Sequence, residues 1–149
     1  MIKAKEIMGI LHQQHPFILI DRITELDGGV SCTAIKNVTL TEPCFQGHFP
    51  GDPVFPGVYI IEAMAQAGGM IFAESGSSQI GVIAAVDKVK FLREVIPGDT
   101  LVLHCRLDSR FGRLAKVAVS VEVDGQPVAK GEISYSFSEP SKPEGETIL

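Results

Sequence analysis

The stretch GHFPGDPVFPGVYIIEAMAQAGGM, residues 47–70, decides most of what can be predicted about this chain. Its first half consists mainly of Gly, Pro and Phe, which favour a stiff loop because Pro fixes φ and Gly permits close backbone approach. From residue 57 onward the pattern predicts a helix over 57–74, with Pro56 at its start. Glu62 is the only charged residue of this helix before its last position. We therefore expect the helix to be buried on nearly every side.

The sequence around this helix predicts a sheet that wraps it. Residues 115–123 alternate between apolar and polar side chains, Asp124-Gly125 is a strong hairpin signal, and residues 127–138 return as the next strand. Further strand-like runs lie at 17–26, 30–39, 79–91 and 100–110, and a short helix is predicted over 3–12. The sum is an α+β fold in which five or six antiparallel strands curve around one long central helix.

The length of the chain predicts one domain and a paired assembly. At 149 residues, with 45% hydrophobic and 21% charged residues, the chain is most simply a single domain over 1–138 with a flexible tail over 139–149. A helix over 57–74 would be about 27 Å long. One sheet curled around such a helix leaves part of it uncovered, so we expect a second copy to cover it in a homodimer.

Composition excludes several classes of protein. The net charge of −5 argues against nonspecific binding to nucleic acid or to an anionic membrane. A membrane span is disfavoured because Pro53 and Pro56 lie near one end of the apolar stretch, and Glu62 and Gln66 lie in its middle. The three cysteines are far apart and no signal peptide is evident, which predicts reduced thiols and a cytoplasmic location. No metal-ligand spacing or nucleotide-binding motif is present, so we expect no metal and no cofactor.

Two residues stand out as candidates for acid–base chemistry. His48 lies in the stiff apolar loop, where few side chains could engage an imidazole, and an imidazole held in place near neutral pH suits a general base. Glu62 lies on the apolar helix with no cationic residue at helical spacing, which favours its uncharged form. Gln66, four residues on, could hydrogen-bond the Glu62 carboxyl group and orient it.

The start of the helix adds an electrophilic element. Pro56 has no amide hydrogen, so the first free donors belong to Gly57, Val58 and Tyr59. With the helix dipole behind them, they could polarise a carbonyl oxygen, which the missing side chain of Gly57 would allow to approach closely. Two aromatic residues of the loop and one of the helix are candidates for lining an acyl slot: Phe49, Phe55 and Tyr59.

This set of groups fits two reactions. One is removal of a proton next to a carbonyl with protonation of a leaving group, and the other is hydrolysis of a thioester by water activated by Glu62. Spacing alone does not choose between them. A third alternative, a non-catalytic module that binds acyl chains, needs no chemistry at all.

The motif GHFPGDPVFPGV followed by EAMAQ resembles the FabZ-type (3R)-hydroxyacyl-acyl-carrier-protein dehydratases. Supporting matches are HPFILIDRITEL, NVTLTEPCFQGHFPG, VDKVKFLREVIPGDTL and VEVDGQPVAKGE. The resemblance covers roughly residues 7–135. It implies the hotdog fold, which agrees with the independent prediction of a sheet around a helix.

The resemblance also implies a reaction and roles for particular residues. Water is lost from a 3-hydroxyacyl thioester carried on acyl carrier protein, giving the trans-2-enoyl thioester of fatty acid elongation. By this resemblance, His48 is the base, Glu62 the acid and Gly57 the amide that holds the thioester carbonyl. The family pairs the histidine of one subunit with the glutamate of its partner, and often assembles three dimers into a hexamer. The related enzymes that also isomerise the double bond typically carry Asp at the Glu62 position.

This chain departs from the family pattern in places that bear on specificity. HQQHP (12–16) stands where the family often has Pro-His-Arg-Tyr-Pro, and Tyr59 stands where an aliphatic residue is common. An acidic carrier protein would need a local basic patch. The candidates for it are Lys88, Lys90, Arg93, Arg110 and Arg113.

Overall fold

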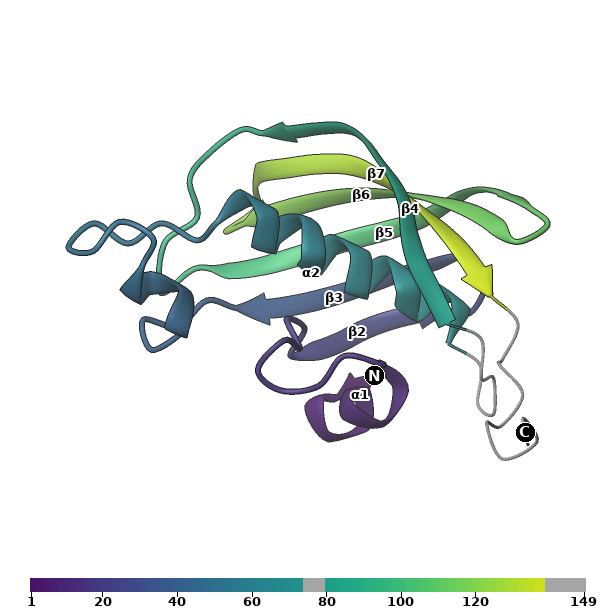
Figure 1. The fold of residues 1–149 in the computed structure, drawn as a ribbon, viewed down its shortest axis with the longest axis horizontal. Helices are drawn as coiled ribbons and strands as arrows, with labels where there is room; N and C mark the ends of the chain where they lie inside the picture. Colours follow the sequence, from purple (N-terminus) through teal and green to yellow (C-terminus); the bar gives the residue numbers. More distant parts are fainter. Residues whose placement is uncertain (74–79, 139–149) are drawn as a thin grey trace, which may run out of the picture.

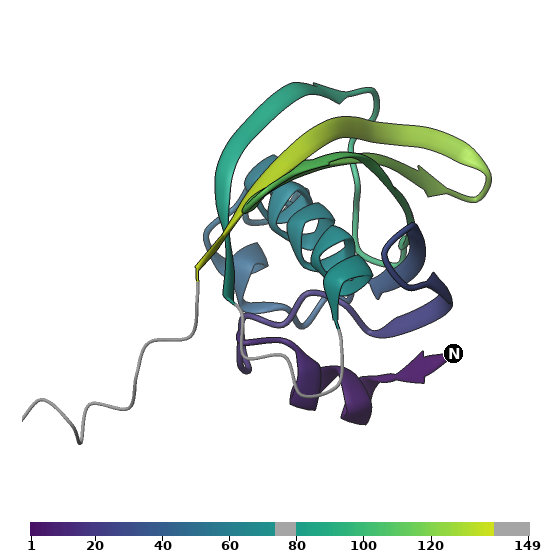
Figure 2. The same cartoon turned by 90° about the vertical axis from the view of Figure 1, so that its right-hand side faces the viewer.

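One curved antiparallel sheet holds a long helix against its inner face. The computed structural model describes residues 1–73 and 80–138, and in them the sheet has seven strands in the order β1-β2-β3-β5-β6-β7-β4. The strands are β1 (Ile2–Lys3), β2 (Arg22–Asp27), β3 (Ser31–Asn37), β4 (Ile80–Phe91), β5 (Thr100–Phe111), β6 (Leu114–Val123) and β7 (Gln126–Ser138). The helices are α1 (Ala4–Ile10), α2 (Gly57–Gly69) and the 3₁₀ turns η1 (Pro43–Gln46) and η2 (Met70–Phe72). Figure 1 shows α2 lying across the strands, and Figure 2 shows the sheet arching over it.

The predicted α+β class is confirmed, and the strand count is one above the predicted range. The additional strand is β1, which pairs with β2 through Ile2–Ile23 and Lys3–Arg22. A two-residue strand has no alternation that sequence periodicity could detect. The first predicted strand began at residue 17, whereas β2 begins only at Arg22. The helix predicted over 57–74 is too long, because α2 ends at Gly69 and the 3₁₀ turn that follows it ends at Phe72. The predicted tail over 139–149 lies outside the described residues.

The second half of the sheet follows directly from its sequence pattern. In β6 the inward residues Ala115, Val117, Val119, Val121 and Val123 are all buried and alternate with outward residues. The hairpin to β7 turns at Asp124 and Gly125, which both have positive φ, 51° and 76°. Both central residues of a type I′ turn need this left-handed conformation, which is why Asp-Gly favours it.

Helix α2 is buried on every side from residue 63 to residue 68 and is partly exposed in its first two turns. Ile60, Ala63, Met64 and Ala67 are buried among residues of the sheet. In contrast, Val58 is 69% exposed and Glu62 is only half-buried. The prediction of burial on nearly every side is therefore confirmed for residues 63–68, whereas the first two turns of the helix are only partly covered within one chain.

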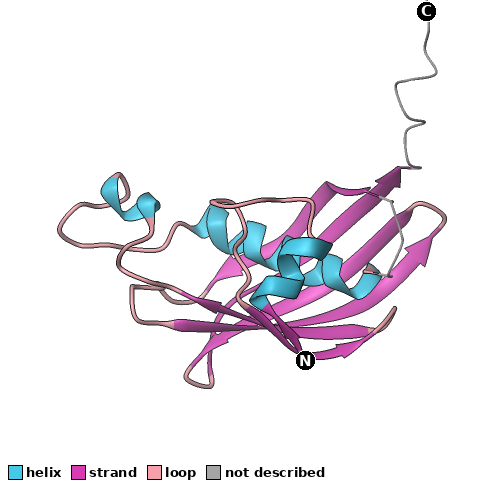
Figure 3. Ribbon diagram, turned by 90° about the horizontal axis from the view of Figure 1, so that it is seen from below, coloured by secondary structure: helices cyan, strands magenta, loops and turns pink. Residues whose placement is uncertain are grey.

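Strand β4 forms one edge of the sheet and pairs with β7 alone. It carries exposed apolar side chains, among them Val82 at 57%, Ile83 at 42% and Val86 at 40%. At the opposite end of the sheet α1 lies beside β2, on the side that faces the viewer in Figure 3. No helix in residues 1–73 or 80–138 is long and apolar enough to cross a membrane.

Candidate active site

The segment before α2 forms a loop beyond the N-terminal end of that helix (Figure 1), and His48 belongs to this segment. We call residues 43–54 the His48 loop. At its start, the Cys44 carbonyl accepts hydrogen bonds from the backbone N–H groups of Gly47 (3.3 Å) and His48 (3.0 Å). Further along, Asp52 N–H donates to the Phe49 carbonyl (2.9 Å), which closes a tight turn. These bonds hold the backbone on both sides of the imidazole.

The His48 ring is fixed in one tautomer. Its Nδ1 lies 2.6 Å from the backbone carbonyl oxygen of Val54. A carbonyl oxygen only accepts hydrogen bonds, so Nδ1 carries the hydrogen and Nε2 of the neutral ring keeps its lone pair. The ring is half-buried and lies against Phe49, with ring centroids 4.2 Å apart. Such an imidazole is oriented to accept a proton at Nε2.

Phe49 has the left-handed conformation, with φ of 62°. This region is uncommon for a bulky residue and is stabilised here by the surrounding loop geometry. Phe49 directly follows His48 in the chain. Its strained backbone therefore helps to set the direction of the His48 ring.

The Glu62 carboxyl group is held by Gln66, one helical turn away on α2. The Gln66 Nε2 group donates to Glu62 Oε1 at 3.0 Å and also to the Phe17 carbonyl at 2.8 Å. Gln66 Oε1 accepts the Leu19 N–H at 2.9 Å. With a side chain only 2% exposed, Gln66 satisfies its polar atoms within the protein and links α2 to the segment before β2. One oxygen of Glu62 is thus occupied, and Oε2 forms no hydrogen bond within the described residues.

The first turn of α2 leaves two backbone donors for a ligand. Tyr59 N–H donates to the Pro56 carbonyl at 2.9 Å, so the expectation of a third free donor at Tyr59 is wrong. Within the described part of the chain, no backbone hydrogen bond takes up the N–H groups of Gly57 and Val58. A Cβ on Gly57 would lie 2.9 Å from Cζ of Phe91, at the end of β4. A side chain at position 57 would therefore press against the Phe91 ring.

The three aromatic candidates for the acyl slot have different environments. Phe49 is 57% exposed, whereas Phe55 is buried at 2%. Phe55 packs against Phe45 (6.2 Å between ring centroids) and Tyr59 (5.8 Å) and so belongs to the core of the single chain. Tyr59 is half-buried. Exposure thus places Phe49 and Tyr59 where a ligand could reach them.

His48 and Glu62 are separate in the contacts of one chain. Across residues 1–73 and 80–138, no hydrogen bond, ion pair or ring contact joins the two side chains or a residue that both touch. The His48 ring contacts its own loop, and Glu62 contacts Gln66. Glu62 and Val58 lie one turn apart in the first two turns of α2, where Val58 is exposed and Glu62 is half-buried. This part of the helix is accessible to another molecule.

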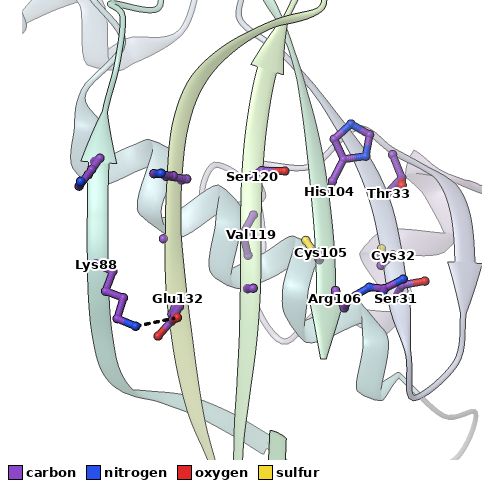
Figure 4. A pocket seen from close by; sticks show the side chains of 14 residues that line it. Ser31, Cys32, Thr33, Lys88, His104, Cys105, Arg106, Val119, Ser120 and Glu132 are labelled. Carbon is purple, nitrogen blue, oxygen red and sulfur yellow. Dashed lines mark ion pairs between the residues drawn. The ribbon is translucent and has the colours of Figure 1, made fainter. Parts of the chain in front are cut away.

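The five basic candidates are all exposed but do not form one patch. Lys88 pairs with Glu132 at 3.5 Å, and Lys88 and Lys90 line a hollow of about 790 Å³ on the outer face of the sheet. Figure 4 shows this hollow with α2 behind the strands. Arg110 instead stacks on Phe72 and Phe137, 5.4 Å from each ring centroid.

Sequence reasoning missed two charged residues beside the His48 loop, Lys36 and Glu42. Lys36 is 6% exposed, and its Nζ lies 2.5 Å from Glu42 Oε1. A signal was present in the sequence, because Lys36 shares the inward, period-two face of β3 with Cys32, Ala34 and Val38. A charged residue on such a face needs a partner.

Comparison with known proteins shows which family the chain belongs to. Residues 11–132 match the FabA-like domain. The chain belongs to the FabA-like family. Among curated FabA-like relatives, it is 43% identical over 141 residues to the 3-hydroxyacyl-[acyl-carrier-protein] dehydratase FabZ of Listeria welshimeri, covering 93% of this chain and 98% of that protein. It is 42% identical to the enzyme of the same name from Listeria monocytogenes, with the same coverage.

Solved structures confirm the hotdog architecture predicted for this FabA-like chain. The dehydratase heterocomplex ApeI:P from Xenorhabdus doucetiae superposes with a TM-score of 0.76 at 15% identity, covering 89% of this chain and 91% of that one. A hypothetical thioesterase with coenzyme A from Streptococcus pneumoniae gives 0.63 at 12% identity, covering 81% and 88%. At such identities the likeness concerns the fold alone.

Proposed function

We propose that this FabA-like protein removes water from (3R)-hydroxyacyl-acyl carrier protein and releases the trans-2-enoyl thioester. The observation that carries the proposal is the bond from His48 Nδ1 to the Val54 carbonyl, which leaves Nε2 as a base. Relatives that are 43% and 42% identical over nearly the whole chain bear the name of this dehydratase. A base, a carboxyl group and free helix amides are the groups that this reaction requires.

In the proposed reaction His48 Nε2 takes the proton from C2 of the acyl chain. The C2–H electron pair forms the new double bond, and the C3–O bond breaks as the hydroxyl takes the proton of Glu62 and leaves as water. His48 then carries one proton too many and Glu62 one too few, so a proton passes from the imidazolium to the carboxylate before the next turnover. The acid and base roles require that the two groups flank C2 and C3 of the same substrate.

The thioester carbonyl is proposed to bind at the start of α2. Negative charge develops on its oxygen as the C2 proton leaves. The N–H groups of Gly57 and Val58 and the positive end of the helix dipole would stabilise this charge. Gln66 would orient Glu62 by donating a hydrogen bond to its Oε1. The acidic proton would then lie on Oε2 and face the leaving hydroxyl.

We also propose that the site forms between two copies of the chain. The exposed Val58 at the start of α2 and the apolar residues of the β4 edge support a homodimer, because an exposed edge strand with apolar side chains favours pairing with another strand. The lack of any contact between His48 and Glu62 within the described part of one chain supports a site to which each copy gives one of them. A trimer of such dimers and a cytoplasmic location remain proposals from the sequence.

Carrier-protein docking is proposed to use exposed basic residues. Lys88 and Lys90 flank the hollow on the outer face, whereas Arg93, Arg110 and Arg113 lie elsewhere on the surface. Neutralising each group separately and measuring KM for the acyl-carrier substrate would show which group the acidic partner contacts. A change in kcat alone would argue against docking.

Absorbance of the conjugated enoyl thioester tests the reaction. Wild-type protein given a 3-hydroxyacyl thioester should produce this absorbance, while His48→Ala and Glu62→Gln should lose at least about a hundredfold in kcat. Undiminished rates in either variant would refute the role assigned to that residue. Release of free thiol, measured with a thiol trap, would favour a thioesterase, and an absence of both signals would favour an acyl-binding module.

A further inference from the structure

Lys36 is a buried cation beside the His48 loop with no part in the proposed chemistry. Its side chain lies on the inner face of β3, where it is 8% exposed. A lysine in such a place needs a compensating charge, and Glu42 provides it through Oε1 at 2.5 Å. The side chain of Glu42 is itself only 17% exposed.

Glu42 anchors the start of the His48 loop. Its second carboxyl oxygen accepts the Thr39 N–H at 3.1 Å, and its backbone N–H donates to the Thr39 carbonyl at 3.2 Å. Its own carbonyl accepts the Phe45 N–H at 3.2 Å, in the first turn of η1. The carbonyl of Cys44, in the same turn, accepts the backbone N–H of His48. The ion pair with Lys36 is therefore connected to His48 through one short turn.

The ammonium group of Lys36 also lies near Phe55, the residue that directly follows the His48 loop. Lys36 Nζ lies 5.9 Å from the ring centroid of Phe55, within the range of a cation–π interaction. Phe55 N–H donates to the Val95 carbonyl at 2.7 Å, which ties this end of the loop to the segment after β4. Val54, directly before Phe55, supplies the carbonyl that holds His48 Nδ1.

We infer that Lys36 is a positioning residue for His48. By pairing with Glu42 and lying over Phe55, it sets the separation of the two carbonyl groups, Cys44 and Val54, that hold the histidine from either side. Lys36 touches no substrate, and it acts through the tautomer and direction of the imidazole. This inference rests on the proposed role of His48 as the base.

Variants of Lys36 and Glu42 can distinguish a positioning role of Lys36 from a loss of stability caused by an unpaired buried charge. Lys36→Met leaves Glu42 unpaired and should destabilise the fold, whereas the Lys36→Met, Glu42→Gln double variant removes both charges and should recover much of that stability. If Lys36 positions His48, the double variant should still have a low kcat, reduced about tenfold or more, with KM within about twofold of wild type. Val121→Ala, a core substitution in β6, serves as a control that lowers stability without touching the loop.

Nitrogen NMR of the His48 ring measures its tautomer, which would not change if Lys36 had a purely structural role. Wild type and Val121→Ala should show one tautomer with hydrogen on Nδ1, and Lys36→Met and the double variant should show a mixture. A wild-type tautomer and kcat in the double variant would overturn the inference. His48→Ala measured alongside distinguishes the two proposals, because an active His48→Ala contradicts the catalytic role of His48, whereas a wild-type tautomer in the Lys36 variants contradicts the positioning role alone.

Discussion

At the scale of single residues, Gln66 shows how one side chain can serve both the fold and the site. Its side-chain amide forms hydrogen bonds with the Leu19 N–H, the Phe17 carbonyl and Glu62. It therefore joins the segment before β2 to the middle of α2. Its helical spacing to Glu62 was visible in the sequence, whereas its bonds to residues 17 and 19 were not. Contacts across 47 and 49 positions depend on the folded topology.

Gln66→Leu should lower the free energy of unfolding by about 2 kcal/mol or more. The substitution keeps the volume but leaves the buried N–H of Leu19 and the carbonyl of Phe17 without partners. Denaturant unfolding measures the change. A loss below about 0.5 kcal/mol would mean that water or a local shift satisfies these groups.

The buried thiols should make the fold sensitive to alkaline pH. Burial raises the pKa of Cys32 from 9.0 to about 12, and burial together with the neighbouring Cys32 raises the pKa of Cys105 still further. Above about pH 9 the unfolded chain loses these protons while the folded chain keeps them, so stability falls as pH rises. Denaturant unfolding in reducing buffer between about pH 7 and pH 11 should show this fall, at up to about 1.4 kcal/mol per pH unit for each thiol. Cys32→Ala with Cys105→Ala should flatten it, and an unchanged slope would contradict the assignment.

At the scale of elements, the first turns of α2 are proposed to take part in the reaction, and the rest of the helix packs in the core. Gly57 is the first residue of the helix and lies under the Phe91 ring. At the far end, a Cβ added to Gly69 would have no neighbouring atom within 4 Å. The two glycines therefore form a matched pair on one helix.

Gly57→Ala should lower kcat/KM at least about tenfold, because a methyl group would crowd the amide proposed to bind the thioester carbonyl. Stability should change by no more than about 1 kcal/mol, since Ala favours the helix and the half-exposed Phe91 ring can shift. Gly69→Ala should leave the rate unchanged. Equal effects of the two substitutions on kcat/KM would show that helix propensity, and not the amide site, is responsible.

The elements differ in how far their sequences predict them. The alternation in β6 and the Asp124-Gly125 turn predicted a hairpin that the structure confirms, because each signal is local. The motif around His48 likewise predicted a stiff loop before a helix. The start of β2 could not be predicted in the same way, because it depends on pairing with β3. The alternation in β3 indicated that Lys36 faces inward, but its pairing with Glu42 could not be predicted, because that contact forms only in the folded turn.

At the scale of the whole molecule, the proposed homodimer uses the exposed β4 edge and the partly exposed start of α2. Light scattering of wild-type protein should give at least twice the mass of one chain. Val82→Lys with Val86→Lys should lower this mass and the dehydration rate together, because charges on an edge strand oppose strand pairing. Leu114→Lys, which also replaces an exposed apolar residue but lies away from the edge, should change neither the mass nor the fold. A monomeric wild type with full activity would contradict a site shared between copies.

The central claim is that His48 of one copy and Glu62 of another act on one substrate, and mixed dimers test it most directly. His48→Ala and Glu62→Gln chains are unfolded together, refolded together and assayed for enoyl thioester formation. A mixed dimer then contains one site with both residues intact, so random mixing should restore about a quarter of the wild-type rate although each variant alone is inactive. A mixture that forms mixed dimers yet stays as inactive as the separate variants would contradict the claim.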